Sequence, residues 1–195
     1  MSELWTAPTN CRVEGCTQQA VLHINHYGDG VILGTEHLCA SHGEWYMRLS
    51  EFSWHVPGGV PKSEKEPVQA VLFRSVFLDG QTTMAMILKE KAGDRVFILP
   101  GDYYTSAAVG QSLQESERPG SHTAMGMLLK ASGTSLLRVT VDSCDDSGHY
   151  RTSVVIQTEK GIQNTLDLRP SDALALSHVC RVPFLVNPSL LWDAR

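Results

Sequence analysis

The chain has 195 residues, 42% of them hydrophobic, and a formal net charge of -5 at pH 7. This length and composition suit a globular domain of ordinary size with a small appendage. The acidic balance argues against a general nucleic-acid coat protein, which needs a basic face to displace counterions from phosphates. It still allows an enzyme that acts on nucleic acid through a local basic pocket.

No apolar run reaches the roughly 18 residues that a membrane-spanning helix needs, so we expect no membrane association. The first residues, MSELWTAPTNCRVEG, lack the basic stretch followed by an apolar stretch that is typical of a signal peptide. We therefore expect a cytoplasmic protein. Its five cysteines should then be reduced, which favours metal binding over disulfides for any cysteine cluster.

Residues 11–42 carry a pattern of metal ligands. Cys11 and Cys16 have the spacing C-x4-C, and Cys39 and His42 have the spacing C-x2-H. Two close pairs of such donors are typical of tetrahedral zinc, and four protein ligands leave no open position, so we expect a structural zinc. A segment this small buries little core, so the metal should supply much of its folding energy.

The chain between these pairs predicts a hairpin, QQAVLHIN and VILGTEHL around the turn HYGDG. The next residues, ASHGEWYMRL, predict a short helix that supplies His42 from its first turn. This order is typical of a treble-clef-like module. His37 could replace His42 as the fourth ligand, and His23 or His26 could also bind metal, but the C-x2-H spacing favours His42.

Residues 53–67, SWHVPGGVPKSEKEP, predict a linker, because three prolines, two glycines and a charged run oppose regular structure. We therefore expect a zinc-binding module over residues 1–52 and a main domain over residues 68–195.

The main domain alternates strand and helix patterns joined mostly by tight turns. This predicts an α+β fold with a mixed, largely antiparallel sheet and helices packed on it. Aspartates 142, 145 and 146 lie in and beside the turn DDSGH, and we interpret them as turn residues rather than metal ligands. The expected strands are 68–78, 83–90, 94–100, 136–142, 151–157, 162–168 and 183–186, and the expected helices are 103–113, 121–131 with Ser121 as its cap, and one that starts at 171.

The segment LDLRPSDALALSHVCRVPFLV predicts a strand, a sharp corner, a helix and a final strand. Pro170 ends the strand, and Ser171 is the expected N-cap of the helix. Asp172 lies in the first turn, where the helix dipole favours an anion. A cap explains Ser171, but it does not explain why Asp167 and Arg169 crowd the same corner.

This corner resembles the most specific motif of the bifunctional nuclease domain family, which is an acidic residue, one spacer and then Arg-Pro-Ser-Asp-Ala before a helix. The motif occupies residues 167–173 here. Two weaker matches are ERPGSH, residues 117–122, and the strand end FILP, residues 97–100. The resemblance covers about residues 68–190. It implies a metal-assisted phosphodiesterase that acts on RNA or DNA.

The residue types at these motifs suit phosphodiester chemistry. His122 could be the general acid or base, and Arg118 or Arg169 could clamp a phosphate. Asp167 and Asp172 could hold a magnesium or manganese ion, and the start of the helix offers amides to an anion. The candidate catalytic residues are therefore Arg118, His122, Asp167, Arg169, Ser171 and Asp172.

Simpler interpretations of the same residues stand beside these. Arg169 and Asp172 could be an ion pair that locks the corner, and His122 could be a first-turn residue without a function. Residues 105–106 and Thr123 stand where the family usually has acidic residues. Together these points favour a non-catalytic regulatory or adaptor protein, which binds a protein or nucleic-acid partner through the zinc module. In either case we expect a homo-oligomer.

Overall fold

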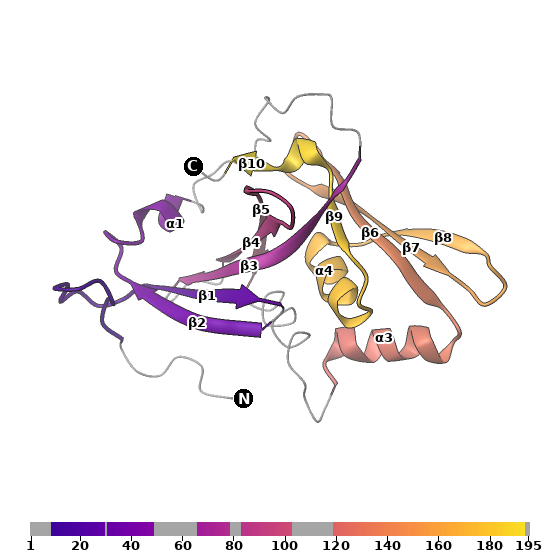
Figure 1. Ribbon diagram of the computed structural model, residues 1–195, viewed down its shortest axis with the longest axis horizontal. Helices are drawn as coiled ribbons and strands as arrows, with labels where there is room; N and C mark the ends of the chain where they lie inside the picture. The colour runs from indigo at the N-terminus through magenta and orange to yellow at the C-terminus, as the bar shows by residue number, and fades with distance from the viewer. Residues whose placement is uncertain (1–8, 30, 49–65, 79–82, 103–118, 194–195) are drawn as a thin grey trace.

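The computed structural model describes residues 9–29, 31–48, 66–78, 83–102 and 119–193 (Figure 1). The predicted helix over 103–113, Arg118 and nearly all of the predicted linker lie outside these residues. The described elements are β1 Leu22–Gly28, β2 Val31–Leu38, α1 Glu44–Arg48, β3 Val68–Leu78, β4 Thr83–Glu90, β5 Arg95–Asp102, α3 Ser121–Ala131, β6 Ser135–Cys144, β7 Tyr150–Gln157, β8 Gln163–Asp167, α4 Pro170–Val179, β9 Phe184–Val186, η1 Pro188–Leu190 and β10 Trp192–Asp193.

The strands form one continuous sheet in the order β10-β5-β4-β3-β9-β6-β7-β8, and β1 and β2 extend it beside β3. Neighbouring strands are antiparallel except β6 and β9, which are parallel. The chain reaches β9 from β6 through β7, β8 and α4, and such a crossover is what a parallel pair requires. The expected α+β fold with a largely antiparallel sheet is therefore confirmed.

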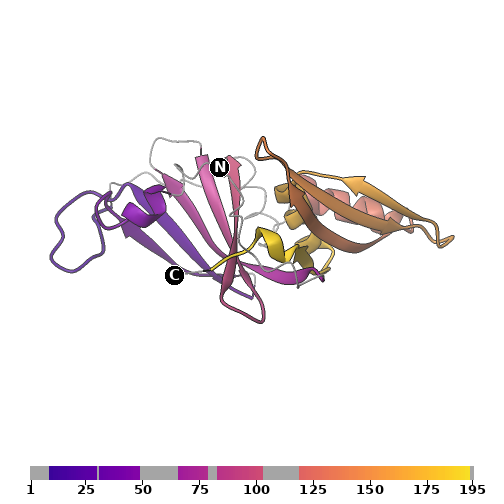
Figure 2. The same cartoon turned by 90° about the horizontal axis from the view of Figure 1, so that it is seen from above.

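The two longer helices lie against the β6–β8 end of the sheet (Figure 2). Six residues of α4 are buried, including Ala173, Leu174, Ala175 and Leu176. They pack into the main core with residues from both halves of the sheet, such as Phe97, Val139 and Val186, which are fully buried. The small side chains of α4 let this helix lie close to the strands, so its position is well determined by packing.

The β1–β2 hairpin is part of the same sheet. Strand β1 pairs with β3 from Leu22 opposite Leu78 to His26 opposite Arg74. A second core cluster combines Cys11 and Leu22 with residues of β3 and β4, so the metal-ligand segment shares a core with the main domain. The domain boundaries drawn from the sequence stay a prediction.

The strands expected in the main domain are present to within two residues, and the expected helix over Ser121–Ala131 has those bounds. The two serine caps are wrong. Gly120 is the N-cap of α3 and Arg169 that of α4, and neither helix start has a side-chain cap. In α4 the reason is Pro170, which takes the first helical position, where its missing N–H costs nothing, and so moves Ser171 inside the helix.

Candidate functional site

A cleft of about 500 Å³ opens at the corner between β8 and α4. Three segments that are far apart in the sequence form its wall: the end of β5, the turn into β7 and the corner itself. The β5 part contains Pro100 of the FILP segment, so two of the three motifs noted in the sequence meet here. The lining residues are Leu99, Pro100, Gly148, His149, Tyr150, Asp167, Leu168, Arg169, Pro170 and Ser171.

Three of the predicted catalytic residues therefore share this cleft. The Thr152 backbone N–H donates to Asp167 Oδ1 at 3.3 Å, which fixes the end of β8 against β7. Asp167 and Arg169 are both exposed, and Ser171 is buried beneath them. The first amides of α4 lack partners within the helix, as in every α-helix. The corner therefore combines the Arg169 guanidinium with free N–H groups that can donate hydrogen bonds to an anion.

Two more predicted residues, His122 and Asp172, form a pair, but neither lines the cleft. His122 Nε2 lies 3.0 Å from Asp172 Oδ1 and joins the start of α3 to the start of α4. The His122 side chain is 12% exposed and that of Asp172 is 41% exposed. The simpler interpretation of an Arg169–Asp172 ion pair is therefore wrong, because the Asp172 carboxylate contacts the imidazole of His122 instead.

Two residues of the cleft were missed by sequence reasoning. His149 has an 82% exposed side chain, and its Nδ1 lies 3.6 Å from Asp145 Oδ1. Tyr150 is half-buried, and its hydroxyl donates to the Ile98 carbonyl at 3.4 Å. Burial, with a smaller contribution from Cys144, raises the pKa of Tyr150, so the phenol stays protonated. No local pattern marks either residue, because the β6–β7 hairpin brings them to the cleft.

Asp145 acts as a turn residue, as expected. It accepts hydrogen bonds from the backbone N–H groups of Ser147 and His149, both at 2.9 Å. The His149 N–H contributes most to holding the pKa of this carboxyl below its ordinary value, burial opposes it, and the Ser147 N–H lowers the pKa further. Asp145 therefore stays ionised, and its Oδ1 lies 3.6 Å from Nδ1 of the His149 ring.

The predicted metal ligands Cys11, Cys16, Cys39 and His42 form one cluster whose donor atoms all lie within 4.8 Å of one another. The Sγ atoms of Cys16 and Cys39 are 3.9 Å apart. His42 Nδ1 lies 3.3 Å from the Sγ atoms of both Cys11 and Cys39. A tetrahedral zinc site has S···S edges of about 3.8 Å and S···N edges of about 3.6 Å, as follows from its bond lengths. The cluster could therefore hold a metal ion, and its donor set is consistent with zinc.

The electrostatics of the thiols also favour a cation. Burial alone would raise the pKa of Cys11, but backbone hydrogen bonds from Cys39 and Val13, with contacts to His42 and Cys16, lower it to about 6. A Gln18 backbone hydrogen bond lowers the pKa of Cys16, but burial and the two neighbouring thiols outweigh it and raise the pKa overall. The charge of one thiolate thus disfavours ionisation of the next thiol, and a bound cation would offset this repulsion.

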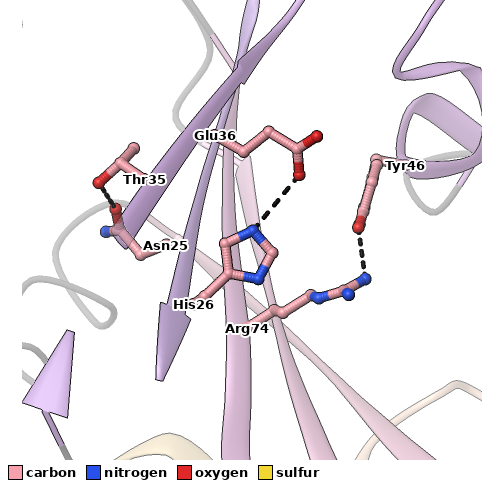
Figure 3. A network of polar contacts seen from close by, with 6 residues as sticks. All are labelled: Asn25, His26, Thr35, Glu36, Tyr46 and Arg74. Atoms are coloured by element: carbon pink, nitrogen blue, oxygen red, sulfur yellow. Dashed lines mark hydrogen bonds and ion pairs between the residues drawn. The ribbon is translucent and has the colours of Figure 1, made fainter. Parts of the chain in front are cut away.

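The alternative histidines have other contacts. The Nδ1 atoms of His23 and His37 lie 2.8 Å apart across β1 and β2, and both side chains are buried. His26 Nε2 lies 3.3 Å from Glu36 Oε2 (Figure 3). His42 is therefore the histidine of the cluster, as the spacing predicted. It lies in a turn before α1 rather than in the helix itself.

The cluster segment is tied to the main domain by polar contacts as well. The Arg74 guanidinium of β3 donates to the Tyr46 hydroxyl of α1 at 2.5 Å (Figure 3). Within the hairpin itself, Thr35 Oγ1 donates to Asn25 Oδ1 at 2.8 Å (Figure 3). Burial is the main reason that the pKa of Tyr46 is raised. The phenol therefore stays neutral and accepts this charge-assisted hydrogen bond.

None of the described helices is long and apolar enough to cross a membrane. No curated protein matches the chain in a sequence comparison. A family model described as the bifunctional nuclease domain matches residues 86–195, which is more than half of the chain. The matched region contains the cleft, the His122–Asp172 pair and both helices that carry them. The chain therefore belongs to the bifunctional nuclease domain family, and this membership indicates a nuclease-related function.

Proposed function

We propose that the protein is a nuclease that hydrolyses phosphodiester bonds of RNA or DNA at the cleft between β8 and α4. The observation that carries this proposal is the meeting of Asp167, Arg169 and Ser171 with Pro100 in one cleft, inside the region that the family model matches. The guanidinium of Arg169 and the first amides of α4 are suited to a phosphate.

Proton transfer is assigned to His122. A carboxylate at 3.0 Å orients the imidazole, as a general acid or base requires. Neither residue of the His122–Asp172 pair lines the cleft, but Asp172 directly follows Ser171, which does. His149 is the second candidate, because it lines the cleft and has Asp145 beside it, but the longer distance of 3.6 Å orients its ring less well.

A magnesium or manganese ion would bind at Asp167. One oxygen of this exposed carboxylate accepts the Thr152 N–H, which leaves further lone pairs for an ion. Magnesium is commonly held by one or two carboxylates and keeps several waters, so a single carboxylate ligand from this corner is compatible with its usual coordination. When bound, the ion would supply positive charge for the phosphoryl oxygens and activate water.

A cleavage assay with magnesium or manganese, with and without chelator, tests the proposal on single-stranded RNA and DNA. We expect His122→Gln to lower the rate by about 100-fold or more, as for loss of a general acid–base group. Arg169→Gln should lower it by a similar order, as for loss of a donor to the transition state. His26→Gln is the matched control, because it removes another histidine–carboxylate pair far from the cleft along the sheet.

Equal trace activity in the wild type, in both variants and in the control would identify a contaminant and reject the enzyme. Loss of activity in His149→Gln but not in His122→Gln would move the proton-transfer role to His149. Binding of nucleic acid without cleavage would favour the regulatory or adaptor function instead.

We further propose that Cys11, Cys16, Cys39 and His42 hold one structural zinc ion. Three thiols and one imidazole with near-tetrahedral edges support this assignment, and no ligand position is left open for substrate. A recruiting role for the surface around this ion, toward a protein or nucleic-acid partner, stays a second and independent proposal.

A further inference from the structure

A second cleft, of about 490 Å³, opens near the other end of α4. Its origin is a gap in the sheet. Strand β3 pairs with β1 from Arg74 onward and with β9 at Val68 and Gln69. Among the described strands none continues this edge between the two pairings, so residues 70–73 of β3 face the cleft (Figure 1). Backbone N–H and C=O groups at such an edge can bond to a ligand.

Positive charge gathers around this cleft although the whole chain is acidic. Lys89, Lys91 and Arg181 line it against one carboxylate, Asp29. Lys89 has its own partner, Asp94, at 2.8 Å, but neither Lys91 nor Arg181 has an ion-pair partner among the described residues. The corner cleft, in contrast, has one arginine and one aspartate in its wall. A small anion is therefore better attracted to the second cleft.

The backbone of Arg181 supplies an independent observation. Its φ is +57°, in the left-handed region that side chains rarely adopt. It holds the position after the C-cap of α4, where its N–H donates to the His178 carbonyl and the next N–H donates to Ser177. Helix α3 ends in the same arrangement of hydrogen bonds, but with Gly133 at φ +66°. Glycine is the usual residue at this position, so an arginine here costs conformational free energy. Such strain indicates that the arginine side chain has a function.

The other residues that line the cleft indicate which class of ligand it could bind. Val71, Phe73 and Pro183 are apolar lining residues; Val71 is 42% exposed, and the Arg74 guanidinium lies 4.5 Å from the centre of the Phe73 ring. His178 also lines the cleft, and partial burial and then the charge of Arg181 lower its pKa. A cavity of this size exceeds the needs of a free inorganic ion and is in the range of small-molecule sites. Cations and apolar side chains in one cleft suit a phosphate joined to a flat ring.

We propose that this second cleft binds a nucleoside monophosphate, with the phosphate at Lys91, His178 and Arg181 and the base against Val71 and Phe73. The site is separate from the cleft between β8 and α4. It does not depend on the nuclease activity, because none of its residues belongs to the proposed catalytic group.

Titration of the full chain with AMP, followed by calorimetry, tests the site. We expect Arg181→Gly to weaken AMP binding at least tenfold while the melting temperature stays equal or rises, because glycine relieves the backbone at φ +57°. Loss of binding could then not be ascribed to unfolding. Lys91→Gln should also weaken binding, and binding should weaken with added salt. Adenosine and inorganic phosphate should each bind at least tenfold more weakly than AMP.

Lys130→Gln, which changes an exposed lysine of α3 that lines neither cleft, is the matched control and should leave the affinity for AMP unchanged. The inference is overturned if AMP does not bind at millimolar concentration. It is also overturned if Arg169→Gln abolishes binding while Arg181→Gly and Lys91→Gln do not, because AMP would then occupy the cleft between β8 and α4. Equal affinity for AMP and adenosine would likewise reject a phosphate site.

Discussion

At the scale of single residues, the clearest chemistry lies in the cluster of Cys11, Cys16, Cys39 and His42. Several thiols held close together resist joint ionisation, since each thiolate raises the pKa of the next, as Cys16 illustrates beside Cys11. A divalent cation reverses this balance and makes the thiolates mutually compatible. The cluster of thiols is therefore electrostatically unfavourable without a metal ion and favourable with one.

Cys39→Ser should abolish zinc binding, because it removes the ligand that contacts both Cys16 and His42. Elemental analysis of the purified wild type should find about one zinc per chain, as one closed four-ligand site requires. Cys144→Ser is the matched control and should keep the zinc. Burial raises the pKa of Cys144, so its thiol stays protonated and is a weak ligand. Full zinc content in Cys39→Ser would refute the ligand set.

At the scale of elements, α3 and α4 meet at a glycine. A Cβ built at Gly126 would lie 2.5 Å from Val179 Cγ1, which is closer than real Cβ contacts allow. Valine in a helix has one strongly preferred rotamer, so its methyl group cannot easily move away. This close approach helps to hold the two helices so that His122 reaches Asp172.

Gly126→Ala should therefore destabilise the fold, in spite of the better helix propensity of alanine. Overpacking costs about 1–3 kcal/mol, and this outweighs the gain of about 1 kcal/mol from propensity. In a Val179→Ala background the same change should instead stabilise the protein, because the obstructing methyl groups are gone. Denaturant unfolding of the four proteins in this double-mutant cycle measures both signs. The same sign in both backgrounds would contradict a direct contact.

Local sequence patterns predicted these elements better than their ends. The bounds of α3 were correct, because Gly120 and Gly133 bracket the helical run. The cap of α4 was misplaced because the preference of serine for an N-cap is weaker than the geometric demand of Pro170 at the first helical position. His149 could not be foreseen, since its place in the cleft depends on the length and bend of the β6–β7 hairpin.

At the scale of the whole molecule, the sequence predicts a zinc-binding module over residues 1–52, and the structure shows that the hairpin in this segment pairs with β3 of the main sheet. Leu22 and Ile24 alternate with polar residues, which is typical of a half-buried strand, whereas in the structure His23 and Asn25 are buried as well. Strand pairing across a long loop is a non-local choice, and a period of two gives faces rather than partners. The link between β1 and β3 therefore had to come from the structure.

This continuity predicts that the metal stabilises the whole chain rather than the first fifty residues alone. Cys11 shares a core cluster with Val76 and Ile87, so loss of the metal should loosen β3 and β4 together with β1. With free zinc at about 100 times its Kd, the metal contributes about 2.7 kcal/mol to folding. Chelation should therefore lower the midpoint of a single thermal transition, and hydrogen exchange should speed up both in β1 and at the buried Val154 of β7. Chelation of Cys39→Ser, the control, should change nothing further. Two separate transitions, with Val154 as protected after chelation as before, would instead mean that the metal segment folds as an independent unit.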